Sequence, residues 1–297
     1  MSGDKVVEQV KESLVRVACC QIEPRVGCKD ENVEKTLRFV EEAVKKGAQI
    51  IVLPELANTG YVFETRREAF ALSEPIPEGP TTKVWEESAR EHGIYIAAGI
   101  TEIEEKSLYN TEVLLGPEGY VGKYRKLHLW NREKFFFEPG DLGLPVFNTE
   151  VGRLALMVCY DLWFPEVARI YAVQGADLIL NSTNWVAGRE VQPDRDKITP
   201  AVCVAQSNMN AVFIAAADRI GIERDQPFLG HSLITDPRGL ILAGPASRDQ
   251  EEIIVADCNL VDARKAKSRS RLNHIMTDRR TDIYDILLGY EAVPFSW

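Results

Sequence analysis

The feature of this chain that most restricts its fold is an internal repeat of helix-to-strand junctions. In each half, segments with helical spacing are followed at once by apolar runs of strand length. The repeated pieces are 47–53 (GAQIIVL) with 175–181 (GADLILN), 93–98 (GIYIAA) with 211–216 (AVFIAA), and the Pro-X-Gly turns at 117–119 and 237–239. Because the three pairs occur in the same order, we predict two related halves. Gly47 and Gly175 are expected to be helix C-caps, and the Pro-X-Gly turns to lie in β-hairpins.

The apolar runs are short and several are unbroken, which is typical of strands covered on both faces. We expect strands at 15–20, 50–53, 94–100, 109–115, 154–158, 178–180, 212–217, 232–235 and 253–256. Helical spacing occurs between them, at 32–46, 81–92, 165–174 and 200–210. This alternation of helices and strands predicts an α/β fold.

No linker rich in proline, glycine or serine divides the 297 residues, so we predict one compact domain over 14–275. We interpret 1–13 as an N-terminal extension and 276–297 as a C-terminal tail. The tail carries apolar residues such as Tyr284 and Trp297, which need a covering surface. We therefore expect the tail to contact a second copy in a homodimer or a higher homo-oligomer.

Charge and cysteine content argue against several classes of protein. The chain has 45 acidic and 35 basic residues and a net charge of −10, which disfavours nucleic acid or an anionic membrane as a partner. Its apolar runs are far shorter than the roughly 18 residues of a transmembrane helix, and its first residues lack a secretory signal pattern. Six scattered cysteines predict reduced thiols, so we expect a cytoplasmic protein. Cys19, Cys20 and Cys28 lack the paired spacing of a zinc site, and we expect no metal.

Two residues follow apolar runs at positions where α/β sheets bind their ligands. Cys159 lies between the run at 154–158 and Pro165, which suits the first turn of a helix. A thiol at such a junction is biased toward the reactive thiolate, although a buried structural cysteine is the common alternative. Glu55 follows the run at 50–53, where burial would favour its use as a general base.

A basic cluster in this acidic chain, at 123–128, includes Lys126. An aromatic loop follows it and offers two candidate carboxylates, Glu133 and Glu138. The residues alone leave open which of the two points inward. They also leave open a papain-like pairing of Cys159 with His128 as its base, although no local signature supports that pairing.

Three motifs in this order resemble the nitrilase superfamily of carbon–nitrogen hydrolases, over about residues 14–285. They are Leu53-Pro54-Glu55, Tyr124-Arg125-Lys126-Leu127-His128-Leu129, and Cys159-Tyr160-Asp161 with Phe164-Pro165-Glu166. The resemblance implies a four-layer αββα sandwich of two similar halves, without a metal or an organic cofactor. It also implies that subunits pair through helices near the nucleophile and often use their C-terminal tails between them.

The same resemblance implies a set of catalytic roles. The nucleophile is Cys159, the general base and acid is Glu55, the cation that holds the oxyanion is Lys126, and the backbone N–H beside it belongs to Tyr160. The second glutamate of the family maps to Glu133, which lies six residues before Pro139, and Glu138 is the weaker candidate.

The residues beside the nucleophile indicate which bond is cut. Nitrilases usually have Cys-Trp-Glu, whereas Cys159-Tyr160-Asp161 resembles the amidase and carbamoylase branches. Hydrolysis of a small linear amide therefore comes first, hydrolysis of an N-carbamoyl amine second and of a nitrile third, with a catalytically silent scaffold as the non-enzyme alternative. Candidate substrate-pocket residues are Tyr61, Trp130, Phe135, Trp163, Asn184 and Trp185, whose bulk predicts an apolar, restricted pocket.

Overall fold

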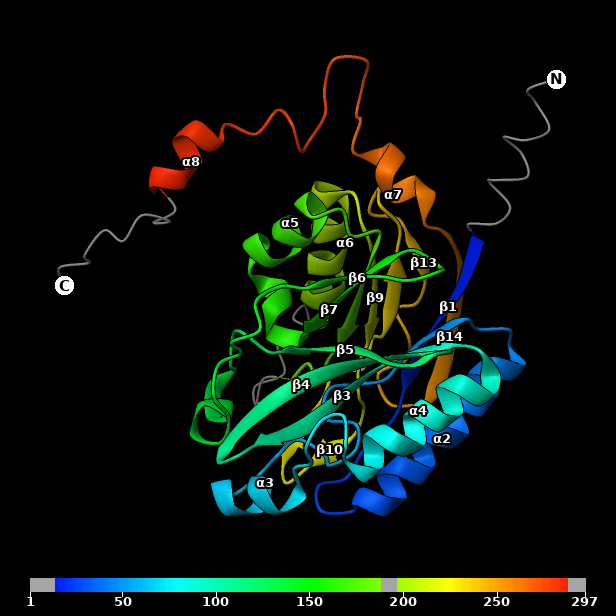
Figure 1. Cartoon of the computed structure of the whole chain (residues 1–297), viewed down its shortest axis with the longest axis vertical. Coiled ribbons are helices and arrows are strands. Elements are labelled where there is room, and N and C mark those ends of the chain that lie inside the picture. Colours follow the sequence, from blue (N-terminus) through cyan, green and yellow to red (C-terminus); the bar gives the residue numbers. More distant parts are fainter. Residues whose placement is uncertain (1–13, 188–196, 288–297) are drawn as a thin grey trace.

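The computed structural model describes residues 14–187 and 197–287, which form two six-stranded sheets packed face to face (Figure 1). The strand order is β14-β1-β2-β3-β4-β5 in the first sheet and β13-β12-β9-β8-β7-β6 in the second. The first sheet contains β1 (Leu14–Gln21), β2 (Ile50–Val52), β3 (Tyr95–Glu104), β4 (Ser107–Gly116), β5 (Gly119–Arg125) and β14 (Glu252–Asn259). The second contains β6 (Val146–Asn148), β7 (Arg153–Val158), β8 (Leu178–Ser182), β9 (Phe213–Ala217), β12 (Leu233–Thr235) and β13 (Ile241–Ala243). A separate hairpin pairs β10 (Ile222–Glu223) with β11 (Gln226–Pro227).

Helices cover the outer face of each sheet (Figure 1). The first sheet is covered by α2 (Lys29–Lys45) and α4 (Pro80–His92), and the second by α5 (Pro165–Val173) and α6 (Ile198–Asn210). The shorter helices are α3 (Arg66–Leu72), α7 (Val261–Ala266), α8 (Thr281–Leu287) and two 3₁₀ helices, η1 (Asn131–Phe135) and η2 (Cys159–Trp163). Within the two described ranges, no helix combines the length and the apolarity needed to cross a bilayer.

Alternate side chains of β1 show how the layers form. Val15, Val17 and Cys19 belong to the core between the two sheets, whereas Ala18 and Cys20 belong to the core beneath α2 and α4. A strand segment buried on both faces needs an unbroken apolar run, as the stretch 17–20 of β1 provides. The structure is therefore a single-domain αββα sandwich, and the predicted fold class is confirmed.

The two sheets repeat one topology. Each has three neighbouring parallel strands, β1-β2-β3 in the first and β7-β8-β9 in the second, with antiparallel strands on either side. Gly47 and Gly175 each stand one residue past the C-caps of α2 and α5, Lys46 and Gln174, and have left-handed φ values of 81° and 90°, the conformation that commonly ends a helix. The Pro-X-Gly turns join β4 to β5 and β12 to β13 in antiparallel pairs. The internal repeat of the sequence is thus a repeat of structure.

The hydrophobic pattern of the sequence does not predict several elements, including β5, β6, β13, α3, α7 and α8. The segment 119–125 (GYVGKYR) mixes glycines and basic residues and has no apolar run, so nothing local marks it as the strand β5. Its Gly122 lies under the ring of Phe147 in β6, where a Cβ atom would clash. Of the predicted termini, α8 is described, whereas 1–13 and 288–297 lie outside the described residues.

Candidate active site

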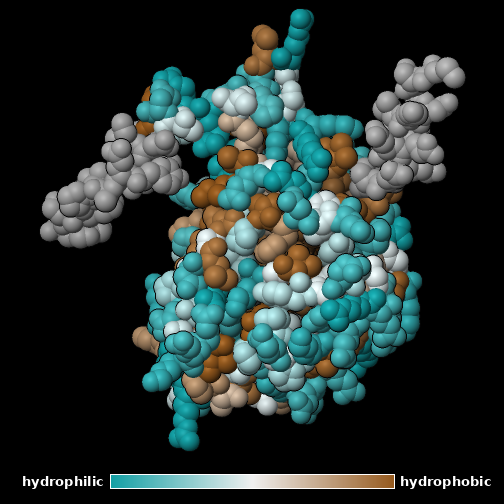
Figure 2. Space-filling model, viewed as in Figure 1, coloured by the Kyte–Doolittle hydropathy of each residue, from teal (hydrophilic) through white to brown (hydrophobic). Residues whose placement is uncertain are grey.

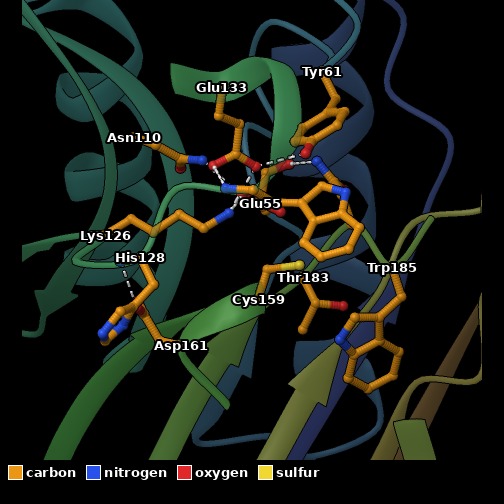
Figure 3. Close-up of polar contacts among 12 residues, drawn as sticks. Glu55, Tyr61, Asn110, Lys126, His128, Glu133, Cys159, Asp161, Thr183 and Trp185 are labelled. Carbon is orange, nitrogen blue, oxygen red and sulfur yellow. Dashed lines mark hydrogen bonds and ion pairs between the residues drawn. The ribbon is translucent and has the colours of Figure 1, made fainter. Parts of the chain in front are cut away.

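A buried ion-pair cluster lies between the two sheets, with Lys126 at its centre (Figure 3). The Lys126 Nζ atom is 2.6 Å from Glu55 Oε1 and 2.8 Å from Glu133 Oε1. Glu55 lies just after β2, Lys126 directly after β5, and Glu133 in η1. Glu55 is 71 residues from Lys126 and Glu133 is seven, and the fold brings the three charges together in a buried position.

Asn110 of β4 holds this cluster at two points. Its Nδ2 atom donates to Glu55 Oε1 at 2.6 Å, and its backbone carbonyl accepts from the N–H of Lys126 at 2.8 Å. Asn110 is not among the site residues predicted from the sequence. The available signal is the polar run at 110–112 inside the predicted strand 109–115, because polar side chains in a buried strand need partners.

The structure places Glu133, and not Glu138, against the lysine. Two further donors reach Glu133, namely the Tyr61 hydroxyl at 2.5 Å from Oε1 and the Trp130 N–H at 3.1 Å from Oε2. Glu138 instead pairs with Arg66 at the surface, at 3.1 Å. The 3₁₀ turn of η1 gives this result, because it directs Glu133 inward while its neighbours stay exposed.

Cys159 occupies a strand-to-helix elbow. It follows β7, begins η2 and has a left-handed φ of 46°, an uncommon conformation for a residue with a side chain. Its N–H donates to Asn181 Oδ1 at 3.0 Å, which fixes the backbone at the turn. Figure 3 shows the sulfur of Cys159 directed toward the Glu55 and Lys126 side chains.

Burial dominates the protonation of these groups. Burial raises the pKa of the Cys159 thiol, and the Glu55 carboxylate raises it further, while Lys126 works in the opposite direction. This corrects the expectation of a thiolate, because loss of solvation outweighs the position at the start of a short helix. Burial also lowers the pKa of Lys126, but the neighbouring carboxylates of Glu133 and Glu55 raise it by more. The side chain therefore stays a charged ammonium. Burial raises the pKa of Glu133 to about 7 despite its ion pair with Lys126.

Cys159 lines a cavity of about 280 Å³. The predicted site residues on its wall are Trp130, Tyr160, Trp163, Asn184 and Trp185. A second cavity of about 370 Å³ is lined by Tyr61 and Glu133, and both cavities share Trp130 and Val186. Phe135 lines neither, since it is 71% exposed.

The alternative pairing of Cys159 with His128 does not form. The Nδ1 atom of His128 lies 2.7 Å from Asp161 Oδ1, and its ring stacks on Phe164 with centroids 3.5 Å apart. The ring is thus held by Asp161, with no contact to Cys159 among the described residues. Among the described residues, no three His, Cys, Asp or Glu side chains are grouped so that they could hold a metal ion.

Comparison with known proteins decides the family. The family model described as carbon-nitrogen hydrolase matches residues 16–268. The chain is a carbon–nitrogen hydrolase. This hydrolase is 43% identical over 271 residues to a protein named nitrilase from Pyrococcus abyssi (strain GE5 / Orsay), with 91% of this chain and 99% of the relative covered. It is 34% identical to an N-carbamoylputrescine amidase from Solanum lycopersicum, with 95% and 97% covered.

Solved structures agree with this result. The crystal structure of a carbon-nitrogen hydrolase from Helicobacter pylori G27 superposes on the hydrolase with a TM-score of 0.82 at 28% identity, and 93% of this chain and 99% of that one are covered. Membership of the nitrilase superfamily and the enzyme class are therefore confirmed. The names of these two relatives point to different substrates, a nitrile and an N-carbamoyl amine, so membership of the family does not fix which bond this hydrolase cuts.

Proposed function

We propose that the hydrolase cleaves the C–N bond of a small linear amide to a carboxylic acid and ammonia, through a thioester on Cys159. The observation that carries this proposal is the buried lysine between two carboxylates, beside a thiol that opens into a cavity. Such a site combines a nucleophile, a proton acceptor and a fixed positive charge for the oxyanion.

Glu55 acts as the general base and acid, and its Oε2 atom has no hydrogen-bond partner among the described residues. It takes the thiol proton as the Cys159 sulfur attacks the amide carbon, so that a C–S bond forms and the carbonyl oxygen becomes an oxyanion. Lys126 and the N–H of Tyr160 stabilise this oxyanion. Glu55 then gives the proton to the nitrogen, the C–N bond breaks, and ammonia leaves the thioester behind.

Water completes the cycle. Glu55 takes a proton from a water molecule that attacks the thioester carbon. When the second tetrahedral intermediate collapses, the C–S bond breaks, the carboxylic acid leaves and Glu55 returns the proton to the Cys159 sulfur. Glu133 is a positioning residue, since it touches Lys126 at 2.8 Å and holds the ammonium in place.

Two buried acceptors favour an amide over a nitrile. Glu55 Oε2 and Asn184 Oδ1 have no partner among the described residues, and Asn184 lines the cavity that contains Cys159. A primary amide nitrogen brings two N–H donors to such acceptors, whereas a nitrile brings none. An N-carbamoyl amine also carries N–H donors, and the 34% identity to an N-carbamoylputrescine amidase makes it the second candidate.

The size and lining of the cavity favour a short acyl chain. Three indole rings, those of Trp130, Trp163 and Trp185, line its volume of about 280 Å³. Walls of this kind suit apolar groups of limited size. We therefore expect short aliphatic amides to be hydrolysed and bulky peptide-like amides to be refused.

The test is ammonia release from amides, N-carbamoyl amines and nitriles of equal chain length, with the wild type and Cys159→Ala side by side. We expect the amides to react fastest, the variant to be inactive, and the quenched wild type to gain the mass of one acyl group. Faster release from a nitrile would replace the amide assignment. No release and no adduct with any substrate would favour the catalytically silent scaffold.

We also infer that the hydrolase forms a homodimer through α5 and α6. These helices expose Val173 and Met209, which are 50% and 47% accessible, and they border a cavity of about 830 Å³ against the segment 269–284. Figure 2 shows several apolar residues on the upper part of this face, and Figure 1 shows α8 standing away from the body of the fold. A second copy would cover this surface, and light scattering should give twice the monomer mass.

Location in the cytoplasm stays a prediction. It rests on the six cysteines, all of which are free thiols in the structure. Reduced thiols are the normal state in that compartment.

A further inference from the structure

A fully buried glutamate that the proposed reaction does not use lies behind the active site. Glu112 is in β4, in the core between the sheets, and has 0% of its surface exposed. Its Oε2 atom accepts from the N–H of Met157 in β7 at 2.9 Å. Its Oε1 atom is 2.7 Å from the Oγ atom of Ser182 in β8, and this Oγ is also 2.7 Å from the carbonyl oxygen of Leu53.

A count of hydrogen atoms shows which groups donate. The Ser182 hydroxyl has one hydrogen, and the carbonyl of Leu53 has none to give. If Ser182 donated to Glu112, the Oγ atom and the Leu53 oxygen would lie 2.7 Å apart with no hydrogen between them. Both contacts are satisfied only when Ser182 donates to Leu53 and Glu112 donates to Ser182. Glu112 must then carry a proton.

We infer that Glu112 is a neutral carboxylic acid that sets the position of Cys159 relative to Glu55. This inference rests on the catalytic roles given under the proposed function. Glu112 is a positioning residue, because it touches neither the thiol nor the carboxylate that exchange the proton.

The surroundings of Glu112 favour the protonated form. Among the described residues it makes no ion pair with a lysine or an arginine, so its ionised form would be an uncompensated buried charge. The titratable groups that interact with it are Glu55 and the hydroxyl of Tyr171 in α5. Burial is the largest influence and raises the pKa of Glu112 well above the ordinary value; the Glu55 carboxylate raises it further, while the hydrogen bond donated by the N–H of Met157 works in the opposite direction.

The bonds of Glu112 lead to both reacting groups. Met157 lies two residues before Cys159, and Leu53 lies two residues before Glu55. In β4 itself, Asn110 lies two residues from Glu112 and holds Glu55 Oε1 at 2.6 Å. One protonated side chain therefore ties together β4, β7, β8 and the end of β2, which carry the nucleophile and the base from opposite sheets.

Two substitutions at Glu112 separate the effect of its hydrogen bonds from the effect of its size. Glu112→Gln keeps both bonds, since the amide nitrogen donates to Ser182 and the amide oxygen accepts from Met157. Glu112→Met keeps the length of the side chain and loses both bonds. Glu74→Met is the control, because Glu74 is also a buried glutamate; it is bonded at 2.6 Å to the hydroxyl of Thr81 and paired at 2.7 Å with Lys29, away from the cluster.

We expect kcat of Glu112→Gln to stay within about threefold of the wild type, as expected when hydrogen bonds are replaced and not lost. Glu112→Met should lose about 100-fold in kcat with little change in KM, since an error of about 1 Å between reacting groups costs that much. Glu74→Met should lose stability and keep its kcat. Equal kcat values for Glu112→Met and the wild type would overturn the positioning role, as would an inactive Glu112→Gln.

The proton itself is detected without any substrate. The infrared difference spectrum of wild type minus Glu112→Gln at neutral pH should contain the carbonyl stretch of a protonated carboxyl group, and a carboxylate band in its place would refute the inference. This result stands if Glu112→Met fails to fold. It also stands if no substrate is hydrolysed, so a failure of the proposed function remains distinguishable from a failure of this inference.

Discussion

A methyl group added to Gly99 should displace the catalytic glutamate. Gly99 lies in β3 beside the turn that carries Glu55, and it accepts from the N–H of Ala57 at 2.8 Å. A Cβ atom built on Gly99 would lie 2.5 Å from the backbone nitrogen of Leu56 and 2.7 Å from the carbonyl oxygen of Pro54. These are main-chain atoms, so no rotation of a side chain relieves the clash.

The size of the effect follows from these distances. Ordinary contact begins at 3.4 Å, so Gly99→Ala requires the backbone around Glu55 to move by about 1 Å. Lys126 now lies 2.6 Å from Glu55, and such a shift breaks this contact. A misplacement of about 1 Å at a reacting group costs roughly 100-fold in rate. Overpacking of the core should cost about 1–3 kcal/mol of stability as well.

The assay compares kcat/KM and urea unfolding of Gly99→Ala with those of Gly116→Ala. Gly116 ends β4, and a Cβ atom there would lie 2.8 Å from the Tyr95 ring, a side-chain clash that does not involve the turn at Glu55. Both variants should lose stability, but only Gly99→Ala should lose about 100-fold in kcat/KM. If folded Gly99→Ala kept the wild-type rate, the premise that the turn fixes the base would be wrong.

Three further predictions concern the ion-pair cluster. Lys126→Met leaves Glu55 and Glu133 buried without their cation, so urea titration should show that the free energy of unfolding falls by about 3–5 kcal/mol. Initial rates should fall by at least about 100-fold. Because all hydrogen-bond partners of Glu133 are donors and its pKa is about 7, its ionised form is the competent one. The rate should therefore rise with pH through about 7. If the rate of Glu133→Gln still rose with pH through about 7, this assignment would be contradicted. Tyr61→Phe removes a hydrogen bond that lowers the pKa of Glu133, so the rise in rate should occur at a higher pH than in the wild type. Rates measured over the same pH series for both proteins would detect this shift.

The parts of the fold that the sequence predicts are those that local patterns encode. The junctions at Gly47 and Gly175 are readable because a C-cap glycine and an unbroken apolar run stand next to each other. The strand β5 is not readable, since its glycines and basic residues make sense only once β4 and β6 lie beside it. The motif at 124–129 indicates Lys126, although the sequence does not predict the strand β5 that positions it.

The active-site residues also divide into those that the local sequence indicates and those that it does not. Glu55 and Cys159 stand directly after apolar runs, where a polar residue is conspicuous in the sequence. Asn110 and Ser182 lie inside strands, and their partners depend on how the two sheets face each other. Phe135 illustrates the reverse error, because its aromatic ring suggests a pocket residue while the turn of η1 directs it to solvent.

The charge of the buried cluster explains how a thiol with a raised pKa can still react. With the thiol neutral, the Lys126 ammonium faces two carboxylate groups, so the cluster carries no more than one excess negative charge. Transfer of the Cys159 proton to Glu55 moves that charge from oxygen to sulfur and leaves the total unchanged. The cost of creating a new buried charge is thereby avoided. The inferred proton on Glu112 follows from the same requirement, since a second uncompensated charge in this core would oppose the thiolate on which the reaction depends.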